Sequence, residues 1–382
     1  MIYLDNSATT YPKPLKVSNA VAYAIKNFGA NPGRSGHTMS RESGAEIDKC
    51  RRTAASFFGA REVQNVAFTL NCTQALNMVI KGILKPGDHV VTSSMEHNAV
   101  MRPLRKLEKT NIITYTAAEV FPCDPERTIQ SFRNAINSNT ALIVCTHASN
   151  VWGIRLPIER IAALAKVYEI PILVDAAQSS GILPIDVSKY GIDYLCAAGH
   201  KGLYGPMGTG VLVTHCGEKL DTIIEGGTGT DSMKFCQPKE MPQKFESGTP
   251  NMIGISGLRA GMEFVKSKGI ENIFNHEMGL ITYLYDRLKT IKGVKLYTPR
   301  PSAEHFVPVL SFNLEGYVSD EIGKILNSYG VEVRTGLHCA PAAHKSMGTL
   351  EIGTIRVSPS VFNNKNEINK LLEIIKNIKP RI

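Results

Sequence analysis

The chain has 382 residues, 43% of them hydrophobic, which is enough to bury a sizeable core and to form two domains. Its formal net charge is +9, but the basic residues are spread along the chain and do not alternate with aromatic residues in one patch. This distribution argues against nucleic-acid binding. It favours anionic ligands and an acidic partner surface instead.

Two further features of the composition bear on the compartment. No apolar run reaches the length of a membrane span, and the first residues lack the basic and apolar regions of a signal peptide. Eight cysteines show no Cys-x-x-Cys spacing and several lie inside apolar runs; they occupy positions 50, 72, 123, 145, 196, 216, 236 and 339. We therefore expect a cytoplasmic protein with mostly buried, reduced thiols, no membrane contact and no metal site.

The first 60 residues predict little regular structure before a helix. Residues 4–12 form an extended, polar segment to which the sequence assigns no role of its own. Residues 29–36 are rich in glycine and predict a loop, and residues 42–58 predict a helix.

From residue 66 apolar runs alternate with amphipathic stretches. The apolar runs predict strands near residues 66–70, 89–93, 111–115, 141–146, 171–175, 192–197 and 209–214. The amphipathic stretches predict helices near residues 73–84, 98–109, 126–137 and 157–169. This α/β alternation predicts a mainly parallel seven-stranded sheet with helices on both faces. No strand is followed by a Walker or Gly-x-Gly-x-x-Gly pattern, so the sequence does not support nucleotide binding.

After about residue 260 the alternation weakens, which predicts a smaller α+β domain. Its helices are expected near residues 270–291, 319–329 and 364–379, and its strands near 294–298, 306–313, 331–335 and 353–358. Pro308 suggests that its strand lies at a sheet edge, and Pro341 is expected to stop a helix. We expect a large domain of residues 15–260 and a small one of residues 1–14 and 261–382.

Polar residues follow several of the predicted strands. Ligands of parallel sheets gather at the carboxyl ends of strands, so these residues are candidates for one site. Cys72 and Thr73 open a helix whose backbone amides form an anion site, although an ordinary helix cap would have the same sequence. His97 reads equally as a cap, and Asn150 equally as a turn residue.

The pair Asp175 and Lys201 gives the strongest chemical signal. Asp175 ends a buried strand and is followed three residues later by Gln178, whereas Lys201 stands among glycines just after the run 192–196. A desolvated lysine loses its proton easily and becomes a nucleophilic amine, and a buried aspartate needs a cationic partner. The alternative for Lys201 is an exposed residue in a glycine-rich turn.

Two candidates lie in the last quarter of the chain. Cys339 follows Arg334 and His338, whose charge or protonation would favour a thiolate, although most lone cysteines in apolar surroundings are inert. Arg356 lies in an alternating strand, where it is either a solvent-facing residue or a bidentate partner for a carboxylate.

Three motifs in order resemble the class V aminotransferase-fold enzymes, specifically the cysteine desulfurases and selenocysteine lyases. They are Val174-Asp175-Ala176-Ala177-Gln178, His200-Lys201-Gly202-Leu203-Tyr204-Gly205-Pro206 and Arg334-Thr335-Gly336-Leu337-His338-Cys339-Ala340, and the likeness extends over essentially the whole chain. The resemblance implies a pyridoxal 5'-phosphate (PLP) enzyme of fold type I. In that family Lys201 would carry PLP as an imine and move the substrate proton, and Asp175 would face the pyridine nitrogen.

The resemblance implies roles for the other candidates as well. His97 would stack on the cofactor ring, Gln178 and Asn150 would lie beside it, and the phosphate would be held by Cys72, Thr73, His200 and Thr249 of a second subunit. Arg356, Asn150 and Arg334 would bind the substrate. Gly199 and Cys72 stand where hydroxyl residues are frequent in the family, which puts the strength of phosphate binding in doubt.

The function implied is removal of sulfur from L-cysteine, with Cys339 taking the sulfur as a persulfide, alanine leaving, and a protein or small thiol accepting the sulfur. A homodimer follows if Thr249 reaches the other subunit. A selenocysteine lyase acting on L-selenocysteine would use the same residues. A catalytically silent partner-binding protein is disfavoured because the sequence retains all five residues with implied roles in the reaction: Lys201, Asp175, His97, Cys339 and Arg356. A transaminase or decarboxylating relative is disfavoured because it has no use for Cys339.

Overall fold

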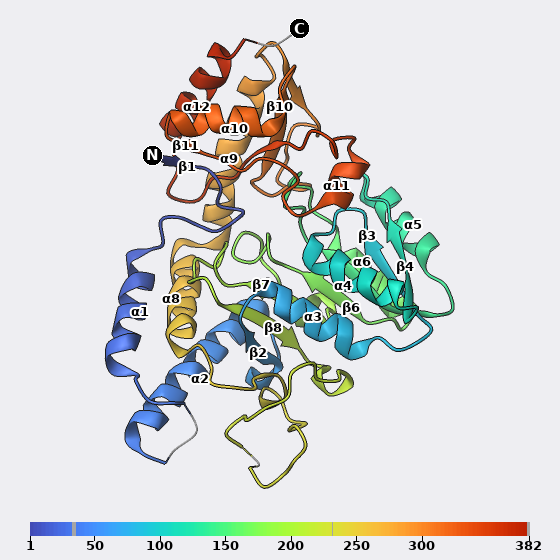
Figure 1. Ribbon diagram of the computed structural model, residues 1–382, viewed down its shortest axis with the longest axis vertical. Coiled ribbons are helices and arrows are strands. Elements are labelled where there is room, and N and C mark those ends of the chain that lie inside the picture. Colours follow the sequence, from blue (N-terminus) through green and yellow to red (C-terminus); the bar gives the residue numbers. More distant parts are fainter. Residues whose placement is uncertain (33–35, 231, 380–382) are drawn as a thin grey trace.

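The structure, a computed structural model, describes residues 1–32, 36–230 and 232–379. Its main feature is a seven-stranded sheet with the strand order β2-β8-β7-β6-β5-β3-β4 (Figure 1). The strands are β2 (Val66–Thr69), β3 (Asp88–Ser93), β4 (Ile113–Ala118), β5 (Thr140–Thr146), β6 (Ile172–Asp175), β7 (Tyr194–Ala198) and β8 (Gly210–Thr214). β8 runs opposite to the other six strands of this sheet, which are parallel to one another, so the predicted mainly parallel sheet is confirmed.

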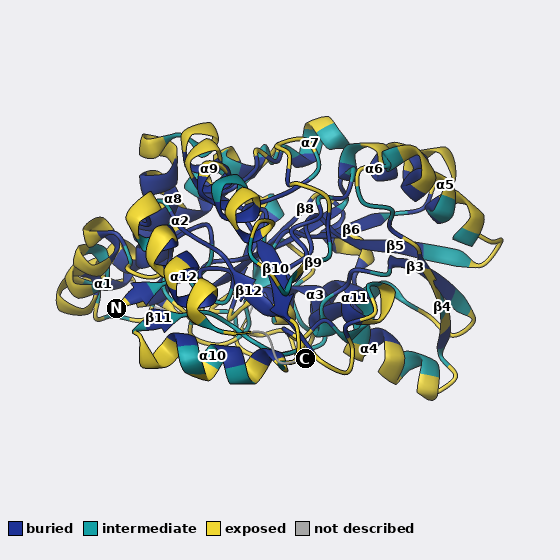
Figure 2. Ribbon diagram, turned by 90° about the horizontal axis from the view of Figure 1, so that it is seen from above, coloured by how far each residue is buried: buried dark blue, intermediate teal, exposed yellow. Residues whose placement is uncertain are grey.

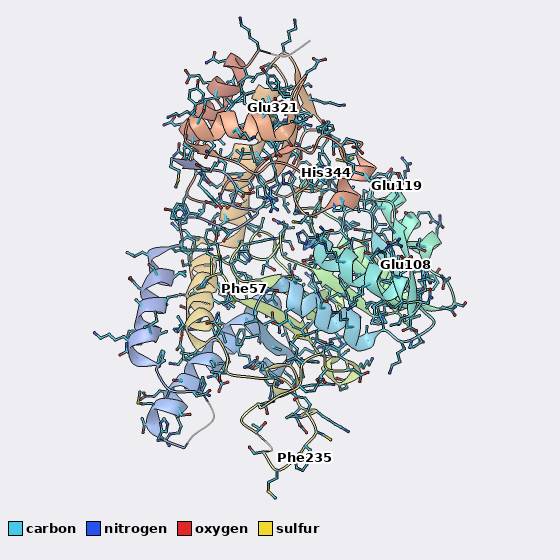
Figure 3. All side chains as sticks on the ribbon, viewed as in Figure 1. Phe57, Glu108, Glu119, Phe235, Glu321 and His344 are labelled. Carbon is cyan, nitrogen blue, oxygen red and sulfur yellow. The ribbon has the colours of Figure 1, made fainter. Side chains whose placement is uncertain are left out.

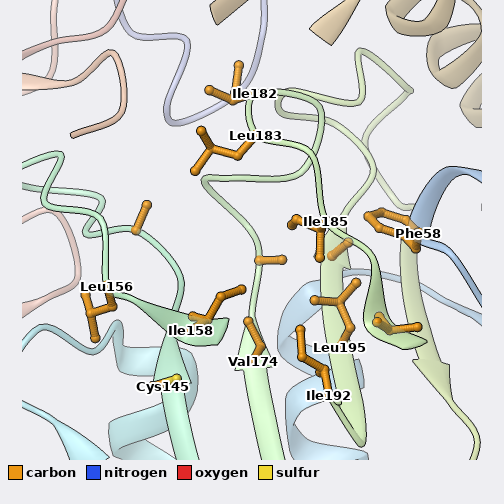
Figure 4. Packing of buried hydrophobic residues seen from close by; sticks show 14 of the residues in the cluster. Phe58, Cys145, Leu156, Ile158, Val174, Ile182, Leu183, Ile185, Ile192 and Leu195 are labelled. Atoms are coloured by element: carbon orange, nitrogen blue, oxygen red, sulfur yellow. The ribbon is translucent and has the colours of Figure 1, made fainter. Parts of the chain in front are cut away.

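Side chains of each strand alternate between two hydrophobic clusters, one on each face of the sheet. Val144 packs in the cluster with α3 and α4, whereas its neighbour Cys145 packs in the opposite cluster, because successive strand residues point to opposite faces. Figure 4 shows Cys145, Val174 and Leu195 from three adjacent strands directed to the same face. Both faces are therefore buried, which explains why the strands are continuous apolar runs.

Helices cover these two faces. They are α2 (Thr38–Phe58), α3 (Cys72–Ile83), α4 (Asn98–Lys109), α5 (Pro125–Ala135), α6 (Ile158–Val167), the short α7 (Val187–Tyr190) and α8 (Met252–Lys268), with 3-10 turns η1 (Val63–Asn65), η2 (Gly217–Lys219) and η3 (Gln243–Phe245). Their outward faces are exposed while the central strands are buried, and only the edge strand β4 of the large sheet is largely exposed among the described strands (Figure 2). No helix of the described residues is long and apolar enough to cross a membrane.

A smaller sheet lies at the other end of the molecule, beyond α9 (Ile270–Leu288) (Figure 1). Its antiparallel strands are β9 (Val294–Leu296), β10 (Leu310–Leu314) and β12 (Ile355–Val357), and β1 (Ile2–Tyr3) pairs separately with β11 (Val331–Glu332). Helices α10 (Ser319–Ser328) and α12 (Lys365–Asn377) complete this part, whereas α11 (Pro341–Ser346) packs through Ala343 in a cluster of the large sheet. The core of the smaller part joins N-terminal Leu4 to Phe312 and Leu371. The division at residues 14 and 260 stays a prediction.

Several local predictions were wrong. An additional helix, α1 (Leu15–Asn27), was missed because exposed apolar residues such as Tyr23 and Ile25 lie outside its buried stripe, of which Val17 and Ala24 are the fully buried members. The predicted strand at 306–313 begins only at Leu310, after Pro308, and lies in the middle of its sheet rather than at an edge.

Pro341 begins a helix rather than stopping one, since proline is well tolerated in the first helical turn. The helix predicted from residue 42 starts earlier, at Thr38. Residues 33–35 of the loop predicted at 29–36 lie outside the described residues.

Candidate active site

Asp175 lies at the carboxyl end of the large sheet, where hydrogen bonds hold its carboxylate in place. It is the last residue of β6 and is 4% exposed. Its Oδ1 accepts hydrogen bonds from the backbone N–H of Ala177 (2.9 Å) and from Cys72 Sγ (3.5 Å) at the start of α3. Burial and the nearby carboxylate raise the pKa of Cys72 well above its usual value, so this thiol is protonated and donates to Asp175.

Lys201 lies three residues beyond β7, next to β6 in the sheet, and is half-buried. The exposed-turn alternative is therefore wrong. Desolvation by burial lowers the pKa of Lys201. Asp175 and Cys72 oppose this shift, whereas the positive charges of Arg356 and Arg334 lower the pKa further. Asp175 ends β6 and Lys201 follows the neighbouring parallel strand β7, so both lie at the same edge of the sheet. The net shift favours the neutral, nucleophilic amine.

The loop around Lys201 leaves little freedom to its backbone. Gly205 N–H donates to Gly199 O (2.8 Å), closing a tight turn around the lysine. A Cβ at Gly199 would lie 2.1 Å from Thr209 Oγ1, so this position has no room for a side chain. The glycine is thus explained by packing, and the structure gives no support for reading it as a lost phosphate-binding hydroxyl.

His97 caps α4 as one sequence interpretation proposed, because its Nδ1 accepts from Ala99 N–H (3.0 Å). Its pKa falls to about 4, first through burial and then through the positive charge of Lys201, with Asp175 opposing. The imidazole is neutral at physiological pH. Its place beside Lys201 and Asp175 is compatible with stacking on a cofactor ring, a role that stays a prediction.

Arg356 is completely buried, so the solvent-facing interpretation is wrong. Its Nη1 donates to Asn150 O (3.0 Å) and its Nη2 pairs with Asp5 Oδ1 (2.5 Å), while its Nε has no partner among the described residues. The sequence analysis assigned no role to residues 4–12, and this too was wrong: Asp5 supplies the negative charge that a buried guanidinium requires.

The same N-terminal segment also supports the lysine loop. The backbone carbonyl of His200 accepts from Thr10 N–H (3.1 Å), from Thr9 Oγ1 (3.1 Å) and from Lys13 Nζ (2.7 Å). Burial lowers the pKa of Lys13 to about 8. Ser7 O accepts from Gln178 Nε2 (3.1 Å), which connects the segment to the turn after Asp175.

Cys339 is exposed on a short loop, and this loop is tied to the large sheet. The backbone N–H of Asn98 donates to Cys339 O (2.7 Å), and Asn150 Nδ2 donates to His338 O (2.7 Å). His338 and Cys339 both have positive φ (50° and 57°), a strained conformation for residues with a side chain. The loop is therefore held in one shape rather than left loose.

Arg334 Nη2 donates to Cys339 Sγ at 3.4 Å, which gives the thiol one cationic neighbour. His338 is not a second one. Burial lowers its pKa to about 2, and its Nε2 faces Thr354 at 3.1 Å. His344, labelled in Figure 3, lies behind it with ring centroids 5.6 Å apart.

The predicted phosphate-binding residues differ in how far they are buried. Thr73 is exposed in the first turn of α3, and His200 keeps a buried Nδ1 without a partner among the described residues. Thr249 is also exposed, and its hydroxyl accepts from Asn31 Nδ2 (3.2 Å).

Glu96 is a further buried residue that sequence reasoning passed over. Its Oε1 accepts from Thr146 N–H (2.8 Å) and from the Ser93 hydroxyl, and burial raises its pKa to about 8. This protonated carboxyl joins β3 and β5 beneath His97. Its only signal in the sequence was its position three residues after a strand.

Comparison with known proteins identifies the family. Residues 2–371 match the family described as aminotransferase class-V. A probable cysteine desulfurase from Methanothermobacter thermautotrophicus is 32% identical over 386 residues, covering 99% of this chain and 94% of the relative. One from Mycolicibacterium paratuberculosis is 32% identical over 99% of this chain, but the chain spans only 55% of that relative's length.

Solved structures agree with the sequence relatives. An apo cysteine desulfurase from Thermococcus onnurineus NA1 superposes with a TM-score of 0.90 at 30% identity, over 98% of this chain and 94% of that one. A cysteine desulfurase from Escherichia coli gives a TM-score of 0.87 at 26% identity, over 98% and 93% of the two chains. The fold, the order of the motifs and these matches together place this chain in the class-V aminotransferase family.

Proposed function

We propose that this protein is a PLP-dependent cysteine desulfurase, which converts L-cysteine to L-alanine and retains the sulfur as a persulfide on Cys339. The observation that carries the proposal is the position of the Cys339 thiol. It is exposed, contacts Arg334, and is joined through Asn98 and Asn150 to the edge of the large sheet that holds Lys201 and Asp175. Arg356, from the smaller sheet, reaches the same place by its bond to Asn150 O. A transaminase or decarboxylase would have no use for a thiol held there.

The residues present suit pyridoxal phosphate. Two buried nitrogens have no partner within the part of the chain that the structure describes: Arg356 Nε, which is a donor, and His200 Nδ1, which is a donor in one tautomer. Both suit an anionic ligand, and the amine of Lys201 favours its neutral form. Lys201 would hold the cofactor covalently and Asp175 would pair with its ring nitrogen; the remaining contacts would come from His97, Gln178, Asn150, Cys72, Thr73, His200 and a partner subunit's Thr249. Bound PLP supplies the electron sink that labilises bonds at the substrate's α and β carbons.

Arg356 and Arg334 would hold the substrate carboxylate. Arg356 donates one N–H to Asn150 O and one to Asp5 Oδ1. Its remaining N–H groups can form charge-assisted hydrogen bonds with the substrate carboxylate. Its full burial strengthens those bonds and fixes the orientation of the amino acid. The amine of Lys201 would move the α-proton of the substrate.

Cys339 would act as the nucleophile. Its thiolate forms an S–S bond with the substrate sulfur while the substrate C–S bond breaks, so the sulfur passes to the enzyme and the carbon skeleton, after gaining a proton, leaves as alanine. Because Cys339 is exposed, a protein or small-thiol acceptor can reach the persulfide. We propose a cytoplasmic location, where such thiols stay reduced.

A homodimer completes the proposal. Thr249 is exposed, and the segment between η2 and η3 carries Met233 and Phe235 with exposed fractions of 95% and 108%. Figure 3 shows Phe235 at the tip of a segment that projects away from the rest of the chain. Large apolar side chains in this position are typical of a subunit interface.

The test is intact-mass spectrometry after incubation of the holoenzyme with L-cysteine. We expect a gain of one sulfur atom per chain that reductant removes, and its loss in Cys339→Ala. Cys123→Ala, which removes another exposed thiol, is the control and should keep the gain. Alanine formation without any sulfur on the wild-type protein would contradict the proposal. Parallel rates with L-selenocysteine decide which chalcogen the site prefers.

A further inference from the structure

A second cluster of ligating side chains lies at the opposite end of the large sheet. Asp193 directly precedes β7, and His215 and Cys216 directly follow β8. These strands are antiparallel, with Tyr194 opposite Thr214, so Asp193 and His215 occupy facing positions just beyond the ladder. Lys201 follows the other end of β7, whose five residues span about 16 Å. The cluster is therefore separate from the proposed active site.

The three side chains offer one carboxylate oxygen, one imidazole nitrogen and one sulfur, all within 4.8 Å of one another. Asp193 Oδ1 lies 3.8 Å from His215 Nε2 and 3.7 Å from Cys216 Sγ. In a tetrahedral zinc site, bond lengths of 2.0–2.3 Å place ligand atoms about 3.3–3.6 Å apart. Two pairs thus need to close by only a few tenths of an ångström, and the exposed His215 can rotate to close the third.

The surroundings hold two of these ligands in place. Asp193 Oδ2 accepts from Ile172 N–H (2.9 Å), which orients the carboxylate and leaves Oδ1 toward the other ligands. Cys216 N–H donates to Thr214 Oγ1 (3.0 Å), and Tyr194 Oη donates to Cys216 O (3.4 Å). Both contacts come from the strand ends themselves, so the sheet fixes the spacing of the ligands.

A cavity of about 530 Å³ opens beside the cluster and is lined by Asp193 and His215. Its wall also carries the basic side chains Arg61, Lys166 and Lys219. A fourth coordination position facing this cavity would be filled by water or by an anion, as in zinc sites that have three protein ligands. Calcium and magnesium prefer oxygen ligands throughout, whereas a mixed sulfur, nitrogen and oxygen set suits zinc.

We propose that Asp193, His215 and Cys216 bind a zinc ion, with an open position facing this cavity. The sequence analysis predicted no metal site because Asp193 stands 22 residues before His215, and only the β7 and β8 pairing brings them together. In the absence of zinc, Cys216 donates a weak hydrogen bond to Asp193, and this is what the structure shows.

The test measures zinc binding rather than catalysis. Holoenzyme carrying Cys339→Ser, which removes the exposed thiol of the proposed active site, is dialysed against buffered free Zn²⁺, and bound metal is counted by mass spectrometry. We expect one zinc per chain, with one sulfur at about 2.3 Å in the zinc K-edge spectrum. Combining the Cys339→Ser variant with Cys216→Ser or His215→Ala should weaken zinc binding by at least about 100-fold, because removing a residue that only hydrogen-bonds a metal ligand already costs up to about that much.

Two controls keep the result interpretable. Cys236→Ser removes another exposed thiol and should leave zinc affinity unchanged. Asp193→Asn nearly preserves the side-chain shape, so it should fold as the parent does by circular dichroism and still lose zinc. No zinc on the parent protein, or equal affinity in the parent and the Cys216→Ser and His215→Ala variants, would overturn the proposal.

Discussion

Replacing Asp5 by alanine tests how the N-terminal segment stabilises the candidate site. Arg356 is fully buried, and Asp5, whose side chain is 19% exposed, is its carboxylate partner. Removing one member of a buried ion pair costs about 3–5 kcal/mol because it leaves an uncompensated charge. We expect about 3 kcal/mol, the lower end, since Asp5 is partly accessible to water and Arg356 keeps its bond to Asn150 O.

Urea unfolding measures this loss. With a slope of about 3 kcal/mol per molar urea, the midpoint should fall by roughly 1 M. Asp5→Asn keeps a hydrogen-bond acceptor without the charge and should fall between the wild type and Asp5→Ala. In a double-mutant cycle, Asp5→Ala should cost much less once Arg356 is already leucine.

A matched control uses an exposed ion pair. Asp286 binds Arg300 with two bonds of 2.7 and 2.8 Å on the surface, so Asp286→Ala should leave the midpoint nearly unchanged. If Asp5→Ala unfolds at the same urea concentration as the wild type, the buried pair contributes nothing and the reasoning fails.

Four other changes test the site and its surroundings. Lys201→Ala should lose the visible absorption of covalently held cofactor, and a variant still reducible by borohydride onto the chain would contradict this. Arg356→Lys should lower kcat/KM for L-cysteine roughly ten- to hundredfold, because charged hydrogen bonds contribute about 1.5–3 kcal/mol; an unchanged value would remove Arg356 from the substrate site. Arg334→Gln should slow alkylation of Cys339 by about two- to fivefold, the range of a partly exposed charge contact, and equal rates would show that the 3.4 Å contact has no effect. Burial raises the pKa of Glu277 to about 8, so its contribution to stability is full below about pH 4.5 and is lost as the pH rises to 8; relative to wild type, Glu277→Gln should gain stability over that window by up to roughly 1.4 kcal/mol per pH unit in urea unfolding, and a constant difference would argue against a protonated Glu277.

The large sheet was predictable because its strands, apart from the edge strand β4, are buried on both faces. Val144 and Cys145 are both apolar and pack on opposite faces, so the sequence shows a continuous run and not an alternation. Asp175 and Lys201 each follow one of these runs, and the rule that ligands gather at strand ends then assigns both to one site. The large sheet and its strand-end residues were therefore accessible from pattern and general physical rules.

Contacts between distant parts of the chain were not predictable in this way. Asp5 and Arg356 are 351 residues apart, and a short polar segment gives no periodic signal of what it pairs with. The helix α1 was missed for a related reason, since its exposed apolar residues hide the buried stripe on which such predictions depend.

The N-terminal segment also explains how Lys201 and Arg356 keep a fixed position relative to each other. Lys201 belongs to the large sheet, whereas Arg356 belongs to the smaller one, so relative movement of the two would separate the proposed cofactor and carboxylate positions. Asp5 binds Arg356, and five to eight residues later Thr10 and Lys13 bind the carbonyl that directly precedes Lys201. A stretch this short cannot follow both partners if they move apart. The segment therefore acts as a strap, and Asp5→Ala should affect the position of the substrate carboxylate relative to Lys201 as well as the stability of the fold.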